Sequence, residues 1–86
     1  MGNKDDLIKK LCRIPIPTNY TMRELDRLMG KCGCSKFSGG RGSSVGYIHE
    51  RTKRILQFDA PHSRSELYRY HIKMIIQFLK DIGEID

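Results

Sequence analysis

The chain has no long hydrophobic run, because its apolar stretches span only a few residues each. A helix that crosses a membrane needs about 20 consecutive, mainly apolar residues. The first ten residues include Asp5 and Asp6 and contain no apolar stretch of the kind found in a secretory signal peptide. The sequence therefore predicts a cytoplasmic protein with neither a membrane span nor a signal peptide.

A disulfide or metal framework is also missing. Cys12, Cys32 and Cys34 are odd in number, and a zinc site would need a fourth ligand. In a reducing compartment we expect three free thiols that are buried or half-buried. No group of carboxylates has the spacing of metal ligands, so we expect no metal and no other cofactor.

Acidic residues are the minority among the charged ones. Sixteen Lys and Arg against ten Asp and Glu give a net charge of +6, which fits a phosphate-bearing partner but does not by itself require one. With 38% hydrophobic and 30% charged residues, the composition is typical of a folded chain. A length of 86 residues predicts a single domain, 1–86, with one small core.

Two helices are expected in the first part of the chain. Residues 5–13 carry apolar side chains on one side, and Pro15 and Pro17 end this short helix. Thr21 and Glu24 form the sequence pattern of a capping box, which begins a second helix. That helix buries Leu25, Leu28 and Met29 and ends at Gly30 or Gly33.

Three short runs are then typical of strands: residues 34–38, 45–50 and 54–59. The last two runs are joined by a turn at residues 51–53. Leu56 and Phe58 alternate with polar residues, so one face of the third strand should be buried against helices.

A long helix follows, with Ser65 as its predicted N-cap. We expect His71 to be a packed structural residue of this helix. Ile72, Ile76 and Leu79 widen the apolar surface, which indicates either burial on two sides or a contact with another chain. The apolar stripe itself consists of Leu67, His71, Met74, Ile75, Phe78 and Ile82. The predicted fold class is α+β, a three-stranded antiparallel sheet with helices on one face.

Two loops carry residues suited to phosphate. The segment 39–44 places glycines and Arg41 between two strands, where backbone N–H groups and a guanidinium can approach an anion. The second loop places His62 and Arg64 just before the last helix, whose N-terminus should add partial positive charge. The order of these pieces indicates RNA as the partner.

This order resembles the HicA family of bacterial toxins, small ribonucleases of toxin–antitoxin pairs. The resemblance places Gly42 and Ser43 on the family's Gly-Ser and Pro61-His62 at the start of its last helix, and it covers nearly the whole chain. It implies a double-stranded-RNA-binding-like fold with an additional short N-terminal helix, cleavage of mRNA without a metal, and a HicB-like antitoxin as partner.

One departure affects the chemistry. Where the family usually has its catalytic histidine, this chain has Ser44, whose hydroxyl titrates far above neutral pH and is no general base. Proton transfer would then fall to His62 or to His49, with His62 favoured because it lies in a loop. The predicted catalytic residues are His62 and Ser44. The predicted RNA-binding residues are Lys36, Arg41, Gly42, Ser43 and Arg64.

Three functions remain open on the sequence. The first is a HicA-like toxin that cleaves mRNA as an endoribonuclease. The second is a module of the same fold that binds RNA but cleaves it weakly or not at all, because Ser44 replaces the usual histidine. The third is a protein-interaction domain that uses the apolar surface of Ile72, Ile76 and Leu79 and binds no RNA.

Overall fold

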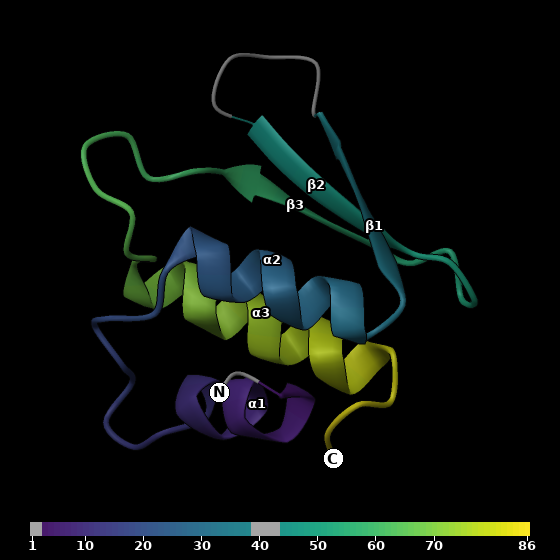
Figure 1. Ribbon diagram of the computed structural model, residues 1–86, viewed down its shortest axis with the longest axis horizontal. Coiled ribbons are helices and arrows are strands. Elements are labelled where there is room, and N and C mark those ends of the chain that lie inside the picture. The colour runs from purple at the N-terminus through teal and green to yellow at the C-terminus, as the bar shows by residue number, and fades with distance from the viewer. Residues whose placement is uncertain (1–2, 39–43) are drawn as a thin grey trace.

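The computed structural model of the protein describes residues 3–38 and 44–86. In chain order its elements are α1 (Lys4–Leu11), α2 (Met22–Lys31), β1 (Cys34–Ser38), β2 (Ser44–His49), β3 (Ile55–Asp59) and α3 (Arg69–Asp81). The three strands form one antiparallel sheet in the order β1-β2-β3. Figure 1 shows the helices on one side of this sheet, with α2 and α3 next to the strands and α1 farther away. The predicted α+β fold with its additional N-terminal helix is confirmed.

Helix α1 is a short amphipathic helix that adds a third layer to the molecule. Its N-terminus is capped by Asn3, whose Oδ1 accepts a hydrogen bond from the backbone N–H of Asp6 at 2.9 Å. Leu7 and Leu11 are buried in the common core. Their burial holds α1 against the layer formed by α2 and α3, because an eight-residue helix has little stability alone.

Helix α2 begins and ends where the sequence predicts. Thr21 Oγ1 accepts from the Glu24 N–H at 3.2 Å, while Glu24 Oε1 accepts from the Thr21 N–H at 3.0 Å, which completes the capping box. Lys10 of α1 lies 2.8 Å from the same carboxylate and links the two helices. Gly33 follows the C-cap with φ of 80°, a left-handed conformation that favours glycine.

The sheet presents one face to the helices and leaves the other uncovered. Tyr47 in the central strand pairs with Lys36 of β1 and Leu56 of β3, and Tyr47 and Leu56 are buried against the helices. On the opposite face, the ring of Phe37 lies so close to Gly46 that an added Cβ would collide with it. The strands differ from their expected bounds by one residue at some ends, and the alternation predicted for β3 is confirmed.

Helix α3 begins three residues later than expected, with Tyr68 rather than Ser65 as its N-cap. Ser65 does not cap it, because α3 starts at Arg69. The segment before the helix is instead extended and pairs with the entrance of α2. The Met22 N–H donates to the Ser65 carbonyl at 2.9 Å, and the Leu67 N–H donates to the Tyr20 carbonyl at 2.7 Å. These two long-range hydrogen bonds hold residues 65–67 away from helical geometry.

The apolar surface of α3 is part of the core. Ile72 and Leu79 are fully buried and Ile76 is half-buried, since α3 lies between the sheet and α1. Of the two alternatives for these residues, burial is therefore confirmed, and the prediction of a contact surface for another chain is wrong. The function of a pure protein-interaction domain loses its basis. Met74, expected in the buried stripe, is 39% exposed.

The cysteines are free, but they differ in exposure. Cys32 is buried and Cys34 half-buried, as expected, whereas Cys12 is exposed. Burial raises the pKa of the Cys32 thiol to about 12 and that of Cys34 to about 11, so both stay protonated near neutral pH. Among the described residues, no helix has the length and apolar character needed to cross a membrane.

Candidate functional site

The candidate site lies at the end of the sheet where β2 begins and β3 ends. Ser44, the first residue of β2, stands opposite Asp59, the last residue of β3. The half-buried Ser44 hydroxyl accepts a hydrogen bond from Gln57 Nε2 at 3.3 Å, on the face of the sheet that the helices leave uncovered. Of the predicted phosphate-binding residues, Arg41, Gly42 and Ser43 lie outside the described residues.

His62 belongs to the loop that leaves the sheet at this same end. It follows Asp59 by three residues, and its side chain is exposed. The partial positive charge expected beside His62 from a helix N-terminus is absent, because α3 begins only at Arg69. The influence of a helix dipole falls off within its first turn. His62 is thus an accessible imidazole placed by the loop rather than by the helix.

The other two histidines have structural positions. His71 is fully buried, as predicted, and both of its ring nitrogens are hydrogen-bonded: Nδ1 to the Tyr68 N–H at 3.1 Å and Nε2 to the Asp59 carbonyl oxygen at 2.9 Å. His49 is buried at the opposite end of the sheet, where its Nδ1 lies 2.7 Å from Thr52 Oγ1. His62 is therefore the only histidine that is exposed at the end of the sheet containing Ser44.

Lys36 and Ser44 line the same hollow, which has a volume of about 380 Å³. The ammonium group of Lys36, however, points toward α2, where Nζ lies 3.1 Å from an Asp26 oxygen. Tyr47 donates to the same carboxylate at 2.6 Å, and burial together with this bond raises the Tyr47 pKa far above its usual range. Tyr47 is therefore no proton-transfer group, and the charge of the half-exposed Lys36 is partly compensated by Asp26.

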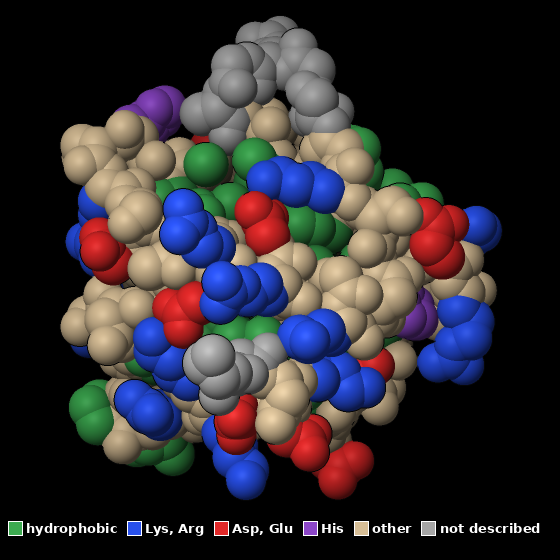
Figure 2. Space-filling view, viewed as in Figure 1, with side chains coloured by type: hydrophobic (Ala, Val, Ile, Leu, Met, Phe, Trp, Pro, Cys, Tyr) green, Lys and Arg blue, Asp and Glu red, His purple; other side chains and the backbone are tan. Residues whose placement is uncertain are grey.

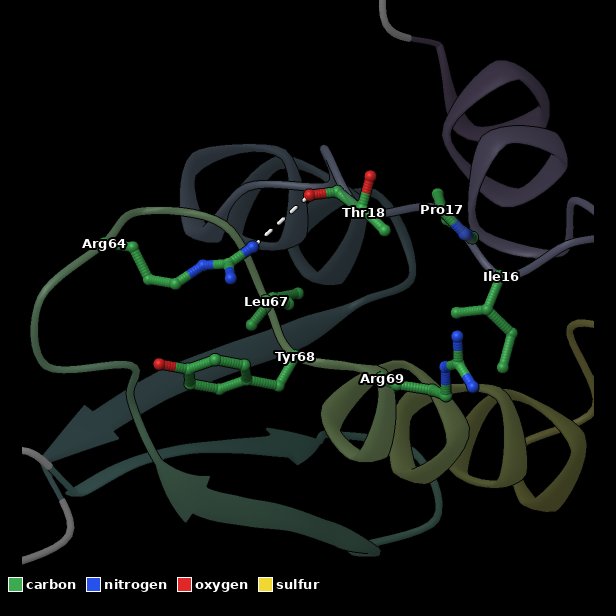
Figure 3. Close-up of a pocket in the computed structure, with 7 residues that line it drawn as sticks. All are labelled: Ile16, Pro17, Thr18, Arg64, Leu67, Tyr68 and Arg69. Atoms are coloured by element: carbon green, nitrogen blue, oxygen red, sulfur yellow. Dashed lines mark hydrogen bonds between the residues drawn. The ribbon is translucent and has the colours of Figure 1, made fainter.

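Arg64 lies in a second hollow, of about 190 Å³, drawn in Figure 3. Its Nη2 donates to the Thr18 carbonyl at 3.4 Å, and its Nε lies 3.7 Å from Glu66 Oε1. The guanidinium also lies over the ring of Tyr68, with 4.8 Å between Cζ and the ring centroid. Figure 3 shows a second guanidinium, that of Arg69, on the far side of Leu67 and Tyr68.

Sequence reasoning missed Arg69 as well as the exposed tyrosines Tyr68 and Tyr70. Helical periodicity predicted that residues 68–70 lie within a helix beginning near Ser65. Exposed side chains are common on a helix, so nothing in the sequence marked these three as part of a site. Their positions depend on the extended segment 65–67, which sequence patterns did not indicate.

On the face drawn in Figure 2, positive charge is spread over several elements rather than gathered in one patch. Figure 2 shows Lys and Arg side chains over α2 and α1, with Asp and Glu among them. Net charge therefore favours an anionic partner without locating its site. Within residues 3–38 and 44–86, no three His, Cys, Asp or Glu side chains come together in a way that could hold a metal ion.

Comparison with known proteins gives a family match. Residues 22–84 match the family model described as the HicA toxin of bacterial toxin-antitoxin. The match begins at the first residue of α2, so α1 lies outside it. Comparison with curated proteins and with solved structures gives no significant match.

Proposed function

The chain belongs to the HicA family of bacterial toxins, and we propose that this toxin acts as an endoribonuclease on mRNA until a HicB-like antitoxin neutralises it. Membership of the family makes the chain the toxin of a toxin–antitoxin system, with an antitoxin as its partner. We propose in addition that its substrate is RNA, that it cleaves this RNA, and that the antitoxin is HicB-like.

The observation that supports the proposal most is the pairing of Ser44 in β2 with Asp59 in β3. This pairing brings the strand that follows the glycine-rich segment and the loop containing His62 to one end of the molecule. Arg64 lies in that loop, so a hydroxyl, an accessible imidazole and a guanidinium occur in two neighbouring parts of the chain. These are the side chains that phosphodiester chemistry needs.

Cleavage without a metal requires two proton transfers. A base takes the proton of the ribose 2′-OH while its oxygen attacks phosphorus, and an acid protonates the departing 5′-oxygen. We assign proton transfer to His62 and positioning of the phosphate to the Ser44 hydroxyl. Lys36, Arg41 and Arg64, with the N–H groups of Gly42 and Ser43, would stabilise the charge that develops on the phosphate.

The replacement of the family's histidine by Ser44 favours one alternative. In it the chain binds RNA with the same loops but cleaves it weakly or not at all. The toxin would then act by occupying mRNA rather than by destroying it.

Two experiments separate these functions. Expression of the chain alone should arrest growth, and co-expression of an antitoxin gene from beside it should restore growth. The purified chain should then be incubated with end-labelled RNA in the presence of a metal chelator. Cleavage supports the ribonuclease, salt-dependent binding without cleavage supports the binding module, and the absence of both refutes RNA as the target.

A further inference from the structure

An aromatic column runs from the core to the surface near the candidate site. Phe58 of β3 contacts the His71 ring at a centroid distance of 4.8 Å, and His71 contacts Tyr70 at 4.2 Å. Tyr70 and Tyr68 are stacked, with 7° between their planes and 5.9 Å between their centroids. Arg64 covers the Tyr68 ring and ends the column.

The inner end of this column is held in place by hydrogen bonds. A backbone N–H only donates and a carbonyl only accepts, so the bonds of His71 to Tyr68 and Asp59 require the neutral ring with its proton on Nε2. The imidazole is fully buried in that orientation. Tyr70 therefore lies on a fixed surface rather than on a mobile side chain.

The outer end is exposed, which is unusual within this chain. Of its four tyrosines, Tyr20 and Tyr47 are buried with hydrogen-bonded hydroxyls. Tyr68 is 37% and Tyr70 58% exposed. Because exposing such large rings forfeits stabilisation from burial, two stacked tyrosines at the surface indicate a binding role.

The surrounding charges distinguish between partners. Arg64 and Arg69 lie in the hollow beside Tyr68, and a neighbouring hollow of about 400 Å³ is lined by Arg23 with Thr21 and Ser65. Aromatic rings next to guanidinium groups suit a nucleotide, whose base stacks on the ring while its phosphate binds the cation.

We propose that Tyr68, supported by Tyr70, forms a stacking platform for an unpaired base of the RNA. The base takes the place of the Arg64 guanidinium over the Tyr68 ring, and Arg64 and Arg69 bind the adjacent phosphates. The inference rests on the proposed function and adds a preference for single-stranded RNA. A paired base cannot stack on the platform, because both of its faces are already occupied by neighbours in the duplex.

The test uses a single-stranded RNA made uncleavable by 2′-O-methyl groups and carrying 2-aminopurine, a base whose fluorescence falls when it stacks. The parent should quench the probe. Tyr70→Ala should weaken binding on the order of ten-fold, Tyr70→Phe should bind like the parent, and binding of a duplex of the same sequence should change little. Tyr68→Ala should also weaken single-strand binding, although it uncovers Arg64.

Two further variants refine the result. Met74→Ala removes another exposed side chain of α3, one turn from Tyr70, and should leave RNA binding unchanged. Glu66→Gln releases Arg64 from its carboxylate partner and should strengthen RNA binding by a few-fold. Thermal unfolding of each variant checks that the fold is retained.

The outcomes distinguish a failure of the stacking platform from a failure of the proposed RNA-binding function. If the parent binds neither RNA, the proposed function and the platform both fail. If the parent binds RNA but a double variant, Tyr68→Ala with Tyr70→Ala, binds it equally well, only the platform is wrong. If Tyr70→Ala and Met74→Ala both weaken the antitoxin complex while RNA binding is unchanged, this surface belongs to a protein partner and the platform is again wrong.

Discussion

The Nε2 atom of His71 lies 2.9 Å from the carbonyl oxygen of Asp59, which joins the first turn of α3 to the last residue of β3. The other ring nitrogen accepts from the Tyr68 N–H. One buried imidazole thus anchors both ends of the loop that contains His62 and Arg64. The position of the proposed catalytic loop therefore depends on a histidine that does not meet the substrate.

Replacing His71 should damage both stability and function. In His71→Leu the partly buried Asp59 carbonyl and Tyr68 N–H lose their partner, at a cost of about 1–3 kcal/mol for each group that water does not reach. Urea denaturation measures the free energy of unfolding. An unchanged value would show that solvent or other groups satisfy these atoms.

His62 and Ser44 should respond differently to substitution. His62→Ala should lower the cleavage rate about 10²- to 10⁴-fold with little change in stability, because the side chain is exposed. Ser44→Ala removes only a hydroxyl that accepts from Gln57 and should cost less. Ser44→His restores the residue usual in the family and should raise the rate. The assignment is wrong if His62→Ala cleaves RNA and arrests growth as well as the parent does.

RNA binding should depend on salt and on Arg64. If about six phosphates are neutralised, affinity should fall by roughly three decades between 50 and 200 mM salt. Arg64→Ala should reduce the slope of log affinity against log salt by about one. Arg51, exposed in the turn at the other end of the sheet, provides the matched control. Equal effects of Arg64→Ala and Arg51→Ala in filter-binding titrations would indicate unspecific attraction.

The capping box should make stability depend on pH. Burial opposes ionisation of Glu24, but hydrogen bonds from Lys10 and Thr21 outweigh it and lower the Glu24 pKa in the folded state. The unfolded chain then takes up this proton more readily, so the contribution of Glu24 is present above about pH 4.3 and is lost as pH falls through the folded pKa. Glu24→Gln should cost about 1 kcal/mol at pH 7. Urea denaturation from pH 7 to pH 3 should show this difference shrinking on the acid side.

The two glycines at the end of α2 should respond with opposite signs to alanine. Gly30 lies inside the helix with free space around it, so Gly30→Ala should stabilise the fold by up to about 1 kcal/mol. Gly33 has φ of 80°, and Gly33→Ala should cost about 1–2 kcal/mol. Thermal denaturation of both variants checks this, and a change of the same sign in both would contradict it.

Sequence patterns determined the features that depend on neighbouring residues. The capping box of Thr21 and Glu24 and the stop at Gly33 involve contacts within a few positions, so residue type and spacing were sufficient. The alternation of Leu56 with polar neighbours similarly indicated which face of β3 is buried, and the position of His71 on an apolar stripe indicated a packed residue. The order of the glycine-rich segment before Ser44, two strands and the Pro61-His62 turn indicated the family, which the family match confirms.

Tertiary structure alone decided what depends on distant pairs. Ser65 is of a residue type favoured at N-caps, but its carbonyl accepts a hydrogen bond from the Met22 N–H, and α3 starts only at Arg69. The same displacement exposes Tyr68 beneath an Arg64 that reaches the carbonyl of Thr18, 46 residues earlier in the chain. Local propensity is worth a few tenths of a kcal/mol per residue, so two long-range hydrogen bonds and the burial of Tyr20 and Leu67 outweigh it.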